Sequence, residues 1–303
     1  MRICSFLPSA TEIVYALGLG ESLSGITYEC DYPPEARSKP VVVHTRLPHS
    51  GNAAEIDRDV SEFMARGESL YRLDVEALKG IQPDLIITQD LCRVCAASPG
   101  DLNQALAVLP RAPRVLSLNP TRLADVWNDI RKVGEVTGRA REAEEVVSEL
   151  ERRVAAVENA VSAVSLRPRV LCLEWLDPPF VAGHWVPEMV ARAGGTDVMG
   201  RAGEPGFRTS WDKVFAARPQ VIVLMPCGYD LKKTVEESKQ TQFPAGWKEL
   251  PAVKEGRVYA VDPSSYFSRP GPRLATGVEI LAHLLHPGRV VAVLPRAAVE
   301  RLG

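Results

Sequence analysis

The chain has 303 residues, of which 46% are hydrophobic, enough for one large domain or two compact lobes with buried cores. Its 36 Lys and Arg residues nearly balance 38 Asp and Glu residues, giving a formal net charge of -2, and no run is rich in Lys or Arg. This composition gives no support for binding to nucleic acid or to a membrane surface, and no apolar run is long enough to cross a bilayer.

The first residues, MRICSFLPSATEI, enter strand-like sequence directly. They show no basic segment, apolar segment or small-residue cleavage site of an export signal. We therefore expect a cytoplasmic protein. Its six cysteines are then expected to be thiols or metal ligands rather than structural disulfides.

Short apolar runs alternate with helical patterns along the chain, which indicates mainly parallel sheet covered by helices on both faces. The expected strands are residues 2–6, 41–43, 84–88, 113–117, 169–173, 220–224 and 257–261. The first helix is predicted to begin with a capping box from Ser9 to Glu12 and to end at Gly18 or Gly20.

A weak internal repeat divides the chain into two halves of similar plan. The segment VEALKGIQPDLIIT at 75–88 matches WDKVFAARPQVIVL at 211–224 as a helix, a turn with proline and a buried strand. The segment between these halves has no strand signals and is predicted to be helical. We expect an N-terminal α/β lobe at 1–120, a connecting helix at 121–165 and a C-terminal α/β lobe at 166–303.

The connecting segment carries an apolar stripe in steps of four and three residues. It consists of Ala143, Val147, Leu150, Val154, Val157, Val161 and Val164. The stripe is compatible with a dimeric coiled coil, but we favour a long helix packed on its own lobes, because coiled coils usually have more heptads. Gly134 and Gly138 can bend or break the first part of this helix.

The motifs, taken in order, resemble the helical-backbone (class III) substrate-binding proteins of ABC importers, most closely the cobalamin-binding periplasmic ones. They are LPSATEIVYALGLG at 7–20, DYPPEA at 31–36, VEALKGIQPDLIIT at 75–88, DPPFVAG at 177–183, SWDKVFAARPQVIVL at 210–224 and YFSRPGPR at 266–273. The resemblance covers most of residues 1–286. It implies two Rossmann-like lobes joined by a long backbone helix, with a ligand such as cobalamin, haem, a ferric siderophore or a metal ion in the cleft between them.

The chain departs from this family at positions that concern the transporter and the ligand. Family members that dock on a permease carry an acidic residue on each lobe; Glu76 matches the first, but Ser268 stands in place of the second. The cobalamin binders have a tryptophan after the third strand, where this chain has HTRLPHSG at 44–51 and then an insertion. We therefore expect no productive docking to a cobalamin permease.

Three cysteines form the first candidate site, because ligands bind beyond the carboxyl ends of strands in an open α/β sheet. Cys92 and Cys95 form a C-x-x-C pair after one strand, and Cys30 follows another. Such thiolates can hold zinc or an iron–sulfur cluster, and the fourth ligand can be Cys227, His44 or His49. The alternatives are a redox pair, a ligand pocket or simply buried thiols.

Aromatic and cationic residues form the second candidate site. Aromatic rings on the loops of the second half can stack on a large flat ligand. A histidine beside them can give an axial imidazole to cobalt or iron, although a hydrogen-bonded surface histidine is the commoner role, and arginines can clamp carboxylates or phosphate or pair with acids. The residues are Trp175, Phe180, His184, Trp185, Tyr266, Arg46, Arg208 and Arg269.

Two functions are compatible with this sequence. The first is a binding protein for a metal-containing cofactor, a corrinoid such as cobalamin or a related tetrapyrrole or iron complex. The alternative is a cytoplasmic metalloprotein or enzyme with a thiolate-bound zinc or iron–sulfur site at Cys30, Cys92 and Cys95. Enzymatic activity would depend on the cysteines alone, because the sequence has no phosphate loop, nucleophile elbow or Ser–His–Asp pattern.

Overall fold

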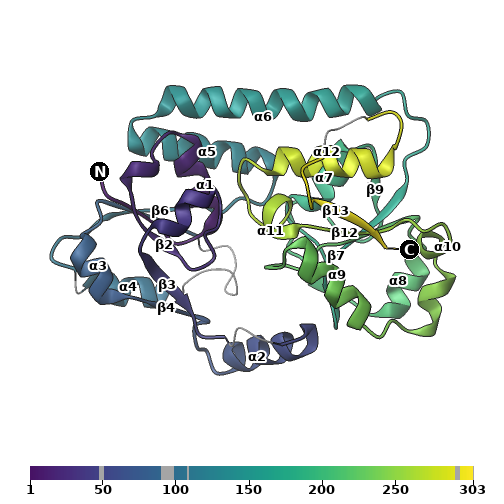
Figure 1. The fold of residues 1–303 in the computed structure, drawn as a ribbon, viewed down its shortest axis with the longest axis horizontal. Helices are drawn as coiled ribbons and strands as arrows, with labels where there is room; N and C mark the ends of the chain where they lie inside the picture. The colour runs from purple at the N-terminus through teal and green to yellow at the C-terminus, as the bar shows by residue number, and fades with distance from the viewer. Residues whose placement is uncertain (48–50, 90–98, 108, 291–293, 303) are drawn as a thin grey trace. The chain divides into compact units, whose positions relative to one another are not determined.

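The computed structural model describes residues 1–47, 51–89, 99–107, 109–290 and 294–302. The chain divides into two units, of which the first comprises Met1–Pro120 and Asp125–Val147 and the second Thr121–Ala124 and Ser148–Gly303. Each unit has its own sheet of mainly parallel strands with helices packed on it (Figure 1). The predicted α/β class with two mainly parallel sheets is confirmed.

The sheet of the first unit has the strand order β4-β3-β2-β1-β5-β6. Its strands are β1 (Ile3–Ser5), β2 (Leu23–Thr27), β3 (Val41–Thr45), β4 (Tyr71–Leu73), β5 (Leu85–Thr88) and β6 (Arg114–Ser117). Neighbouring strands pair in parallel, except that β4 runs antiparallel to β3. The central strands β1 and β5 are wholly buried, as expected for apolar strands covered on both faces.

The helices of the first unit cover this sheet. They are α1 (Pro8–Ala16), η1 (Gly20–Ser22), η2 (Pro34–Ser38), α2 (Ala53–Ala65), α3 (Val75–Ile81), α4 (Pro99–Ala107) and α5 (Leu123–Thr137). The capping box predicted at Ser9–Glu12 is wrong: α1 begins at Pro8 with Leu7 as its N-cap, because proline suits the first helical position. The predicted end is confirmed, since Gly18 adopts a left-handed conformation with φ +71°.

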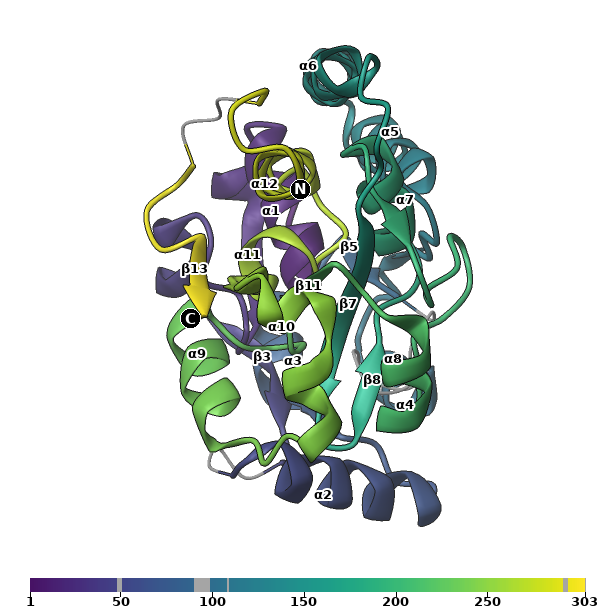
Figure 2. The same cartoon turned by 90° about the vertical axis from the view of Figure 1, so that its right-hand side faces the viewer.

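The sheet of the second unit has the order β10-β8-β7-β11-β12-β13, and β9 pairs with β7. Figure 2 labels β8, β7, β11 and β13 of this sheet. Its strands are β7 (Arg169–Leu176), β8 (Pro179–Val181), β9 (Thr196–Asp197), β10 (Phe207–Arg208), β11 (Val221–Leu224), β12 (Val258–Val261) and β13 (Val299–Leu302). The core strands β7, β11 and β12 are parallel, whereas the pairings of β8, β10 and β13 are antiparallel. The helices are α7 (Val186–Arg192), α8 (Trp211–Ala217), α9 (Leu231–Gln240), η3 (Ala245–Glu249), α10 (Pro251–Lys254), α11 (Pro263–Tyr266) and α12 (Leu274–Leu285).

The segment expected to be one connecting helix consists of two, α5 and α6 (Ala140–Val161). The break lies at Gly138, whose φ of +73° ends α5. Gly134 allows the two helices to approach closely, since a Cβ there would lie 2.5 Å from the Cβ of Ala143. The boundary between the two units falls within α6, between Val147 and Ser148.

The apolar stripe of α6 is buried within the single chain. Ala143 and Val147 are buried in the first unit, and the stripe continues in the second unit with Leu150, Val154, Val157 and Val161, none more than 5% exposed. Because the chain itself covers these side chains, the structure supports a helix packed on its own units rather than a dimeric coiled coil.

The internal repeat recurs in the structure down to its helix ends. Asp74 and Ser210 cap α3 and α8 by accepting hydrogen bonds from backbone amides three residues later. Each helix has seven residues and ends in a left-handed residue, Gln82 with φ 49° or Arg218 with φ 45°, followed by proline and a buried strand. The two segments therefore share the same local conformation, as the sequence comparison indicated.

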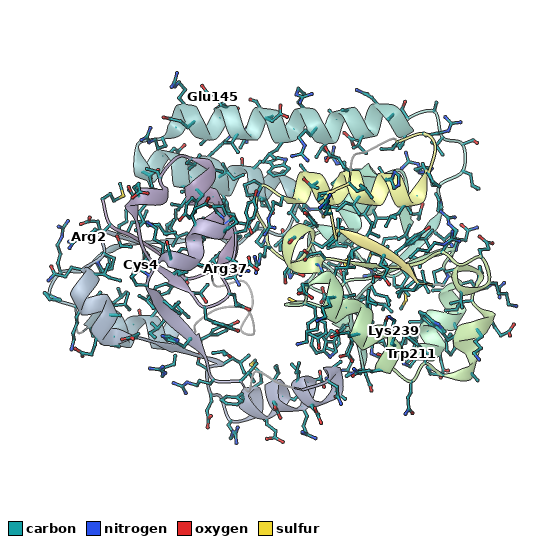
Figure 3. The ribbon with its side chains drawn as sticks, viewed as in Figure 1. Arg2, Cys4, Arg37, Glu145, Trp211 and Lys239 are labelled. Carbon is teal, nitrogen blue, oxygen red and sulfur yellow. The ribbon has the colours of Figure 1, made fainter. Side chains whose placement is uncertain are left out.

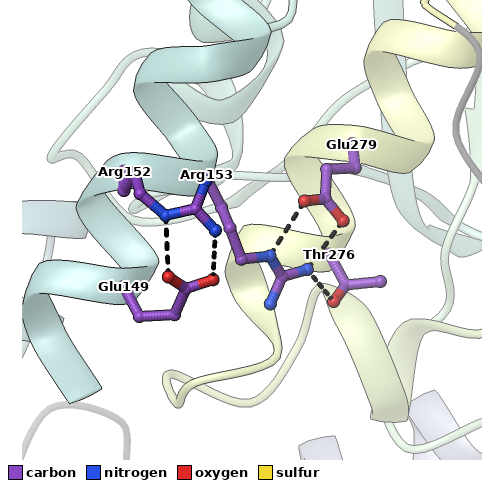
Figure 4. A network of polar contacts seen from close by, with 5 residues as sticks. All are labelled: Glu149, Arg152, Arg153, Thr276 and Glu279. Carbon is purple, nitrogen blue, oxygen red and sulfur yellow. Dashed lines mark hydrogen bonds and ion pairs between the residues drawn. The ribbon is translucent and has the colours of Figure 1, made fainter. Parts of the chain in front are cut away.

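Helix α6 is joined to α12 in the second unit by a partly buried ion pair (Figure 4). The guanidinium of Arg153 donates from Nε and Nη2 to Glu279 at 2.9 and 2.6 Å, and Nη2 also donates to Thr276 Oγ1 at 2.7 Å. Arg152 makes an equally short pair with Glu149 on the exposed side of α6. The two pairs therefore differ mainly in burial and in the number of helices they join.

We expect Glu279→Gln to lower the free energy of unfolding by about 1–2 kcal/mol, because it leaves a partly buried guanidinium with a weaker partner. The side chains of Arg153 and Glu279 are only 27% and 26% exposed, against 68% and 52% for Arg152 and Glu149. The matched variant Glu149→Gln should therefore leave stability unchanged within error. Urea unfolding of both variants is the measurement, and equal losses would contradict this assignment.

Candidate ligand-binding site

The candidate site lies at the carboxyl ends of the parallel strands of the second unit, where an open α/β sheet binds ligands. Strand β7 extends beyond its paired neighbour: Leu173 pairs with Leu224, the last residue of β11, and Trp175 follows two residues later. Tyr229 lies in the loop after β11, and Tyr266 ends the short helix after β12. The three aromatic residues thus leave the sheet at one edge.

Two of the rings at this edge, those of Trp175 and Tyr229, contact each other. The Trp175 and Tyr229 ring centroids are 5.5 Å apart with the planes tilted by 60°. Trp175 also lies opposite Phe180 in the antiparallel ladder between β7 and β8. Trp175 and Phe180 are half-buried, whereas Tyr229 is only 2% exposed. Tyr229 therefore supports Trp175 from the protein side. We call this group the aromatic row; its members are Trp175, Phe180, Tyr229 and Tyr266.

Three members of the aromatic row have a cation over the ring. The guanidinium carbon of Arg208 lies 5.3 Å from the Phe180 centroid, and Lys233 Nζ lies 4.0 Å from the Tyr229 centroid. The guanidinium carbon of Arg273 lies 5.8 Å from the Tyr266 ring. These distances fall within the range of cation–π attraction. Positive charge and aromatic surface are thus combined at the edge of the second sheet.

The loop after β11 and helix α11 form one connected surface. The backbone N–H of Ser264 donates to the carbonyl of Tyr229 at 3.2 Å. Asp262 caps α11 by accepting from the amide of Ser265, and burial raises the pKa of this carboxyl group. Burial also raises the pKa of Tyr229, whose hydroxyl lies 3.5 Å from Glu237. Tyr229 therefore stays protonated and neutral.

Trp185 occupies the interior of the second unit. It is 6% exposed, and its indole N–H donates to the carbonyl of Phe267 at 2.7 Å. This bond joins the start of α7 to the segment between α11 and α12. The placement gives Trp185 a structural role and leaves little ring surface for a ligand.

His184 lies beside Trp185 in a constrained backbone conformation. Its φ is 52°, its amide donates to the carbonyl of Glu204 at 2.6 Å, and its carbonyl accepts from Gly203. The imidazole stacks on Trp185 with centroids 5.6 Å apart, and Nδ1 is buried without a hydrogen-bond partner among the described residues. Burial lowers the pKa of His184. The imidazole is therefore neutral at neutral pH.

The remaining predicted arginines and docking residues occupy other places. Arg46 follows β3 in the first unit and is exposed, whereas Arg269 is half-buried between α11 and α12 of the second unit. The Glu76 side chain is 82% exposed and accepts a bond from Lys79 at 2.9 Å. Ser268 is half-buried and donates its amide to Pro263. The expected weakness of permease docking stays a prediction.

Of the three cysteines of the predicted metal site, only Cys30 lies among the described residues. Cys92 and Cys95 lie outside the described residues. Cys30 is 4% exposed, and its Sγ lies 3.0 Å from Thr11 Oγ1, which donates to Ser5. Within the described part of the chain, no group of three or more His, Cys, Asp or Glu side chains could hold a metal ion. Cys30 has the surroundings of a buried thiol, and the three-cysteine metal site stays a prediction.

Two further cysteines lie in the cores of the sheets. Cys4 in the first sheet and Cys172 in the second are both fully buried in strands, and Figure 3 labels Cys4. Burial raises the pKa of Cys4 to about 12 and that of Cys172 well above its usual range. Neither thiol can ionise readily, so neither is suited to bind a metal as a thiolate.

Sequence reasoning missed three residues of the site, Tyr229, Lys233 and Arg273. Tyr229 stands in the segment PCGYD directly after a predicted strand, which was a sufficient signal for its position. Lys233 and Arg273 carried no such signal. Their importance depends on the rings over which they lie.

The chain is similar to binding proteins of known families. The model of the family described as "Periplasmic binding protein" matches residues 3–265. An uncharacterized ABC transporter substrate-binding lipoprotein, YvrC of Bacillus subtilis, is 26% identical over 94% of this chain and 80% of its own length. A vitamin B12-binding protein of Vibrio cholerae is 23% identical over 92% of this chain and 86% of its own length.

A solved structure has the same fold. The periplasmic heme-binding protein RhuT from Roseiflexus sp. RS-1, in apo form, superposes with a TM-score of 0.71 at 25% identity. The match covers 95% of this chain and 98% of that one. The resemblance inferred from the sequence motifs is therefore confirmed.

These comparisons overturn the predicted compartment. The relatives are a substrate-binding lipoprotein and members of a family described as periplasmic, so the prediction of a cytoplasmic protein is wrong. Because the expectation that the cysteines are kept reduced depended on a cytoplasmic location, that expectation no longer has a basis.

Among the described residues, no helix is both long and apolar enough to cross a membrane.

We expect His184→Asn to reduce the loss of stability on acidification. Because burial lowers the native pKa of His184, the unfolded chain binds the proton first, so stability falls as the pH drops below the unfolded value of about 6.5. Asparagine tolerates the left-handed backbone but does not titrate. The measurement is the free energy of unfolding of both proteins from about pH 8 to pH 5; parallel curves would contradict the assignment.

Proposed function

The chain belongs to the periplasmic binding protein family, and on this premise we propose that it binds a corrinoid or a related metal tetrapyrrole. The observation that carries the proposal is the aromatic row at the carboxyl edge of the second sheet, in which Trp175 contacts Tyr229 and lies opposite Phe180. Aromatic side chains at such an edge suit a large, flat, mostly apolar ligand.

Relatives support the ligand class at a coarser level. One relative is a vitamin B12-binding protein, and one structure of the same fold is a heme-binding protein. Both of these ligands are flat macrocycles that hold a metal. A scaffold shared among such proteins does not by itself choose the ligand, because the side chains of the site do so. The metal would thus enter as part of the ligand.

The residues of the aromatic row have different roles in this proposal. Trp175 and Phe180 are half-buried and would supply stacking surface, whereas the buried Tyr229 holds Trp175 in place. His184 is neutral, as a metal ligand must be, but its ring is stacked on Trp185. An axial bond from His184 would therefore require the imidazole to turn away from Trp185.

The alternative of a thiolate-bound zinc or iron–sulfur protein receives no support from the described residues. Cys30 is buried, and its Sγ forms a hydrogen bond with Thr11 Oγ1. Stacking on the aromatic row needs no protein-bound metal. We therefore place the binding of a metal-containing ligand ahead of thiolate metal chemistry.

We expect calorimetric titration with cyanocobalamin, cobinamide and haemin to detect binding of at least one of them. Trp175→Ala should weaken that binding roughly tenfold, because it removes a large stacking surface. Tryptophan fluorescence gives a second readout of the same equilibrium. The proposal fails if none of the three ligands binds at about 1 mM, since even such weak binding is measurable.

Trp247→Ala is the matched control for this experiment. Trp247 is also a half-buried tryptophan of the second unit, and it stacks on Phe243 with centroids 4.0 Å apart. Its other ring contact is with Trp211, which Figure 3 labels. Equal losses of affinity in both variants would show that Trp175 acts through general stability rather than through the site.

A further inference from the structure

We infer, on the basis of the proposed function, that the site selects metal complexes with carboxylate groups on their rim over uncharged analogues. Lys233 and Arg208 would bind these carboxylates, with Arg273 as a third cation. This inference goes beyond the class of macrocycle, because it concerns the charge of the substituents around it.

The first support is the position of the cations on the aromatic row. Arg208 and Phe180 are partners in the antiparallel ladder of β10 and β8, so strand pairing holds the guanidinium beside the ring. Lys233 lies in the first turn of α9, and its Nζ is 4.0 Å from the Tyr229 centroid. A ligand that stacks beside these rings must meet the cations as well.

The second support is the donor geometry of Arg208. Its guanidinium carbon lies 5.3 Å from the Phe180 centroid, and a planar guanidinium presents its N–H donors as a rigid fork. Two such donors match the two oxygens of one carboxylate, whereas a neutral amide offers a single acceptor and no charge. Arg208 is exposed, so a ligand from solvent can reach its guanidinium.

The third support is that nearby carboxylates of the second unit already interact with other groups of the protein. Asp230 caps α9 by accepting from the amide of Lys233 at 2.7 Å, and Asp262 caps α11 in the same way. Glu237 is 7% exposed and accepts from the Tyr229 hydroxyl. Glu174 lies at the β-bulge of β7, where a Cβ on Gly206 would collide with its Oε1, and it also takes part in a further interaction.

Arg208 and Arg273 take part in further interactions, so a bound carboxylate would share or exchange them. Lys233 therefore gives the simplest test. Its ammonium group has three donors and a compact charge, and the ring below it fixes where that charge lies. Replacing Lys233 changes the charge beside Tyr229 without removing the ring.

The experiment compares ligands that share a ring and a metal but differ in their carboxylates. The pairs are haemin against haemin dimethyl ester, and cobyrinic acid against cobinamide. We expect the carboxylate-bearing member of the binding pair to bind about tenfold more tightly at low salt, and the difference to shrink as ionic strength rises. Lys233→Gln and Arg208→Gln should each reduce the preference, and Lys233→Arg should retain it.

The controls are two other cations that cover no ring of the aromatic row, one on α9 and one in the loop before β10. Lys232→Gln removes an 84% exposed lysine that pairs with Glu236 at 3.8 Å, and Arg201→Gln removes a 75% exposed arginine that pairs with Glu204 at 3.6 Å. Both variants should keep the wild-type preference. Thermal unfolding of each variant shows whether it is folded.

The outcomes separate this inference from the proposed function. Equal affinity of the acid and the uncharged analogue, or a preference that survives in both Lys233→Gln and Arg208→Gln, would overturn the inference and leave the proposed function standing. If neither these four ligands nor cyanocobalamin bind to the wild-type protein, the proposed function itself fails. An equal loss of preference in the control variants would assign the effect to general surface charge and likewise overturn the inference.

Discussion

The in-register pairing of β7 with β11 is the interaction on which the candidate site depends. Val170 to Leu173 pair with Val221 to Leu224, and all eight side chains are fully buried. Burying one such side chain is worth about 1.5–3 kcal/mol, and a slip of one residue would turn every side chain to the other face. The register therefore fixes Trp175 beside the loop that carries Tyr229, and the bond from the Cys227 amide to the carbonyl of Glu174 extends the ladder to the site.

Most of the fold could be predicted because its signals are local. The helix, proline and strand of the repeat recur in both units, and the residue before each strand even makes the same bond: Asp84 and Gln220 accept from the backbone amides of Arg2 and Arg169. Strand β2, LSGIT, was missed because polar residues interrupt its apolar run, and β8 and β10 because two or three residues carry no periodicity. These short strands form only through their partners.

Residues of the candidate site could be predicted from the sequence only where their position along a strand determines where they lie in the structure. The position of Trp175 could be predicted because it lies near the end of β7, and that of Phe180 because it comes just after the turn that follows this strand. The burial of Trp185 could not be foreseen, because it depends on the carbonyl of Phe267, 82 residues away in the sequence. The pairing of Arg208 with Phe180 depends likewise on β10, which sequence reasoning did not find.

The site combines two kinds of recognition. The aromatic rings contribute mainly to affinity, and the cations contribute mainly to selectivity. Trp175 contacts Tyr229, and the three cation–π contacts involve the other rings of the aromatic row. Aromatic surface attracts any flat apolar ring regardless of its metal, whereas cations discriminate by the groups on the rim. Trp175 comes from the core strand β7, whereas Arg208 comes from the two-residue edge strand β10. Changes in such edge segments can alter the preferred ligand without disturbing the sheet, which is how one scaffold can serve different metal complexes.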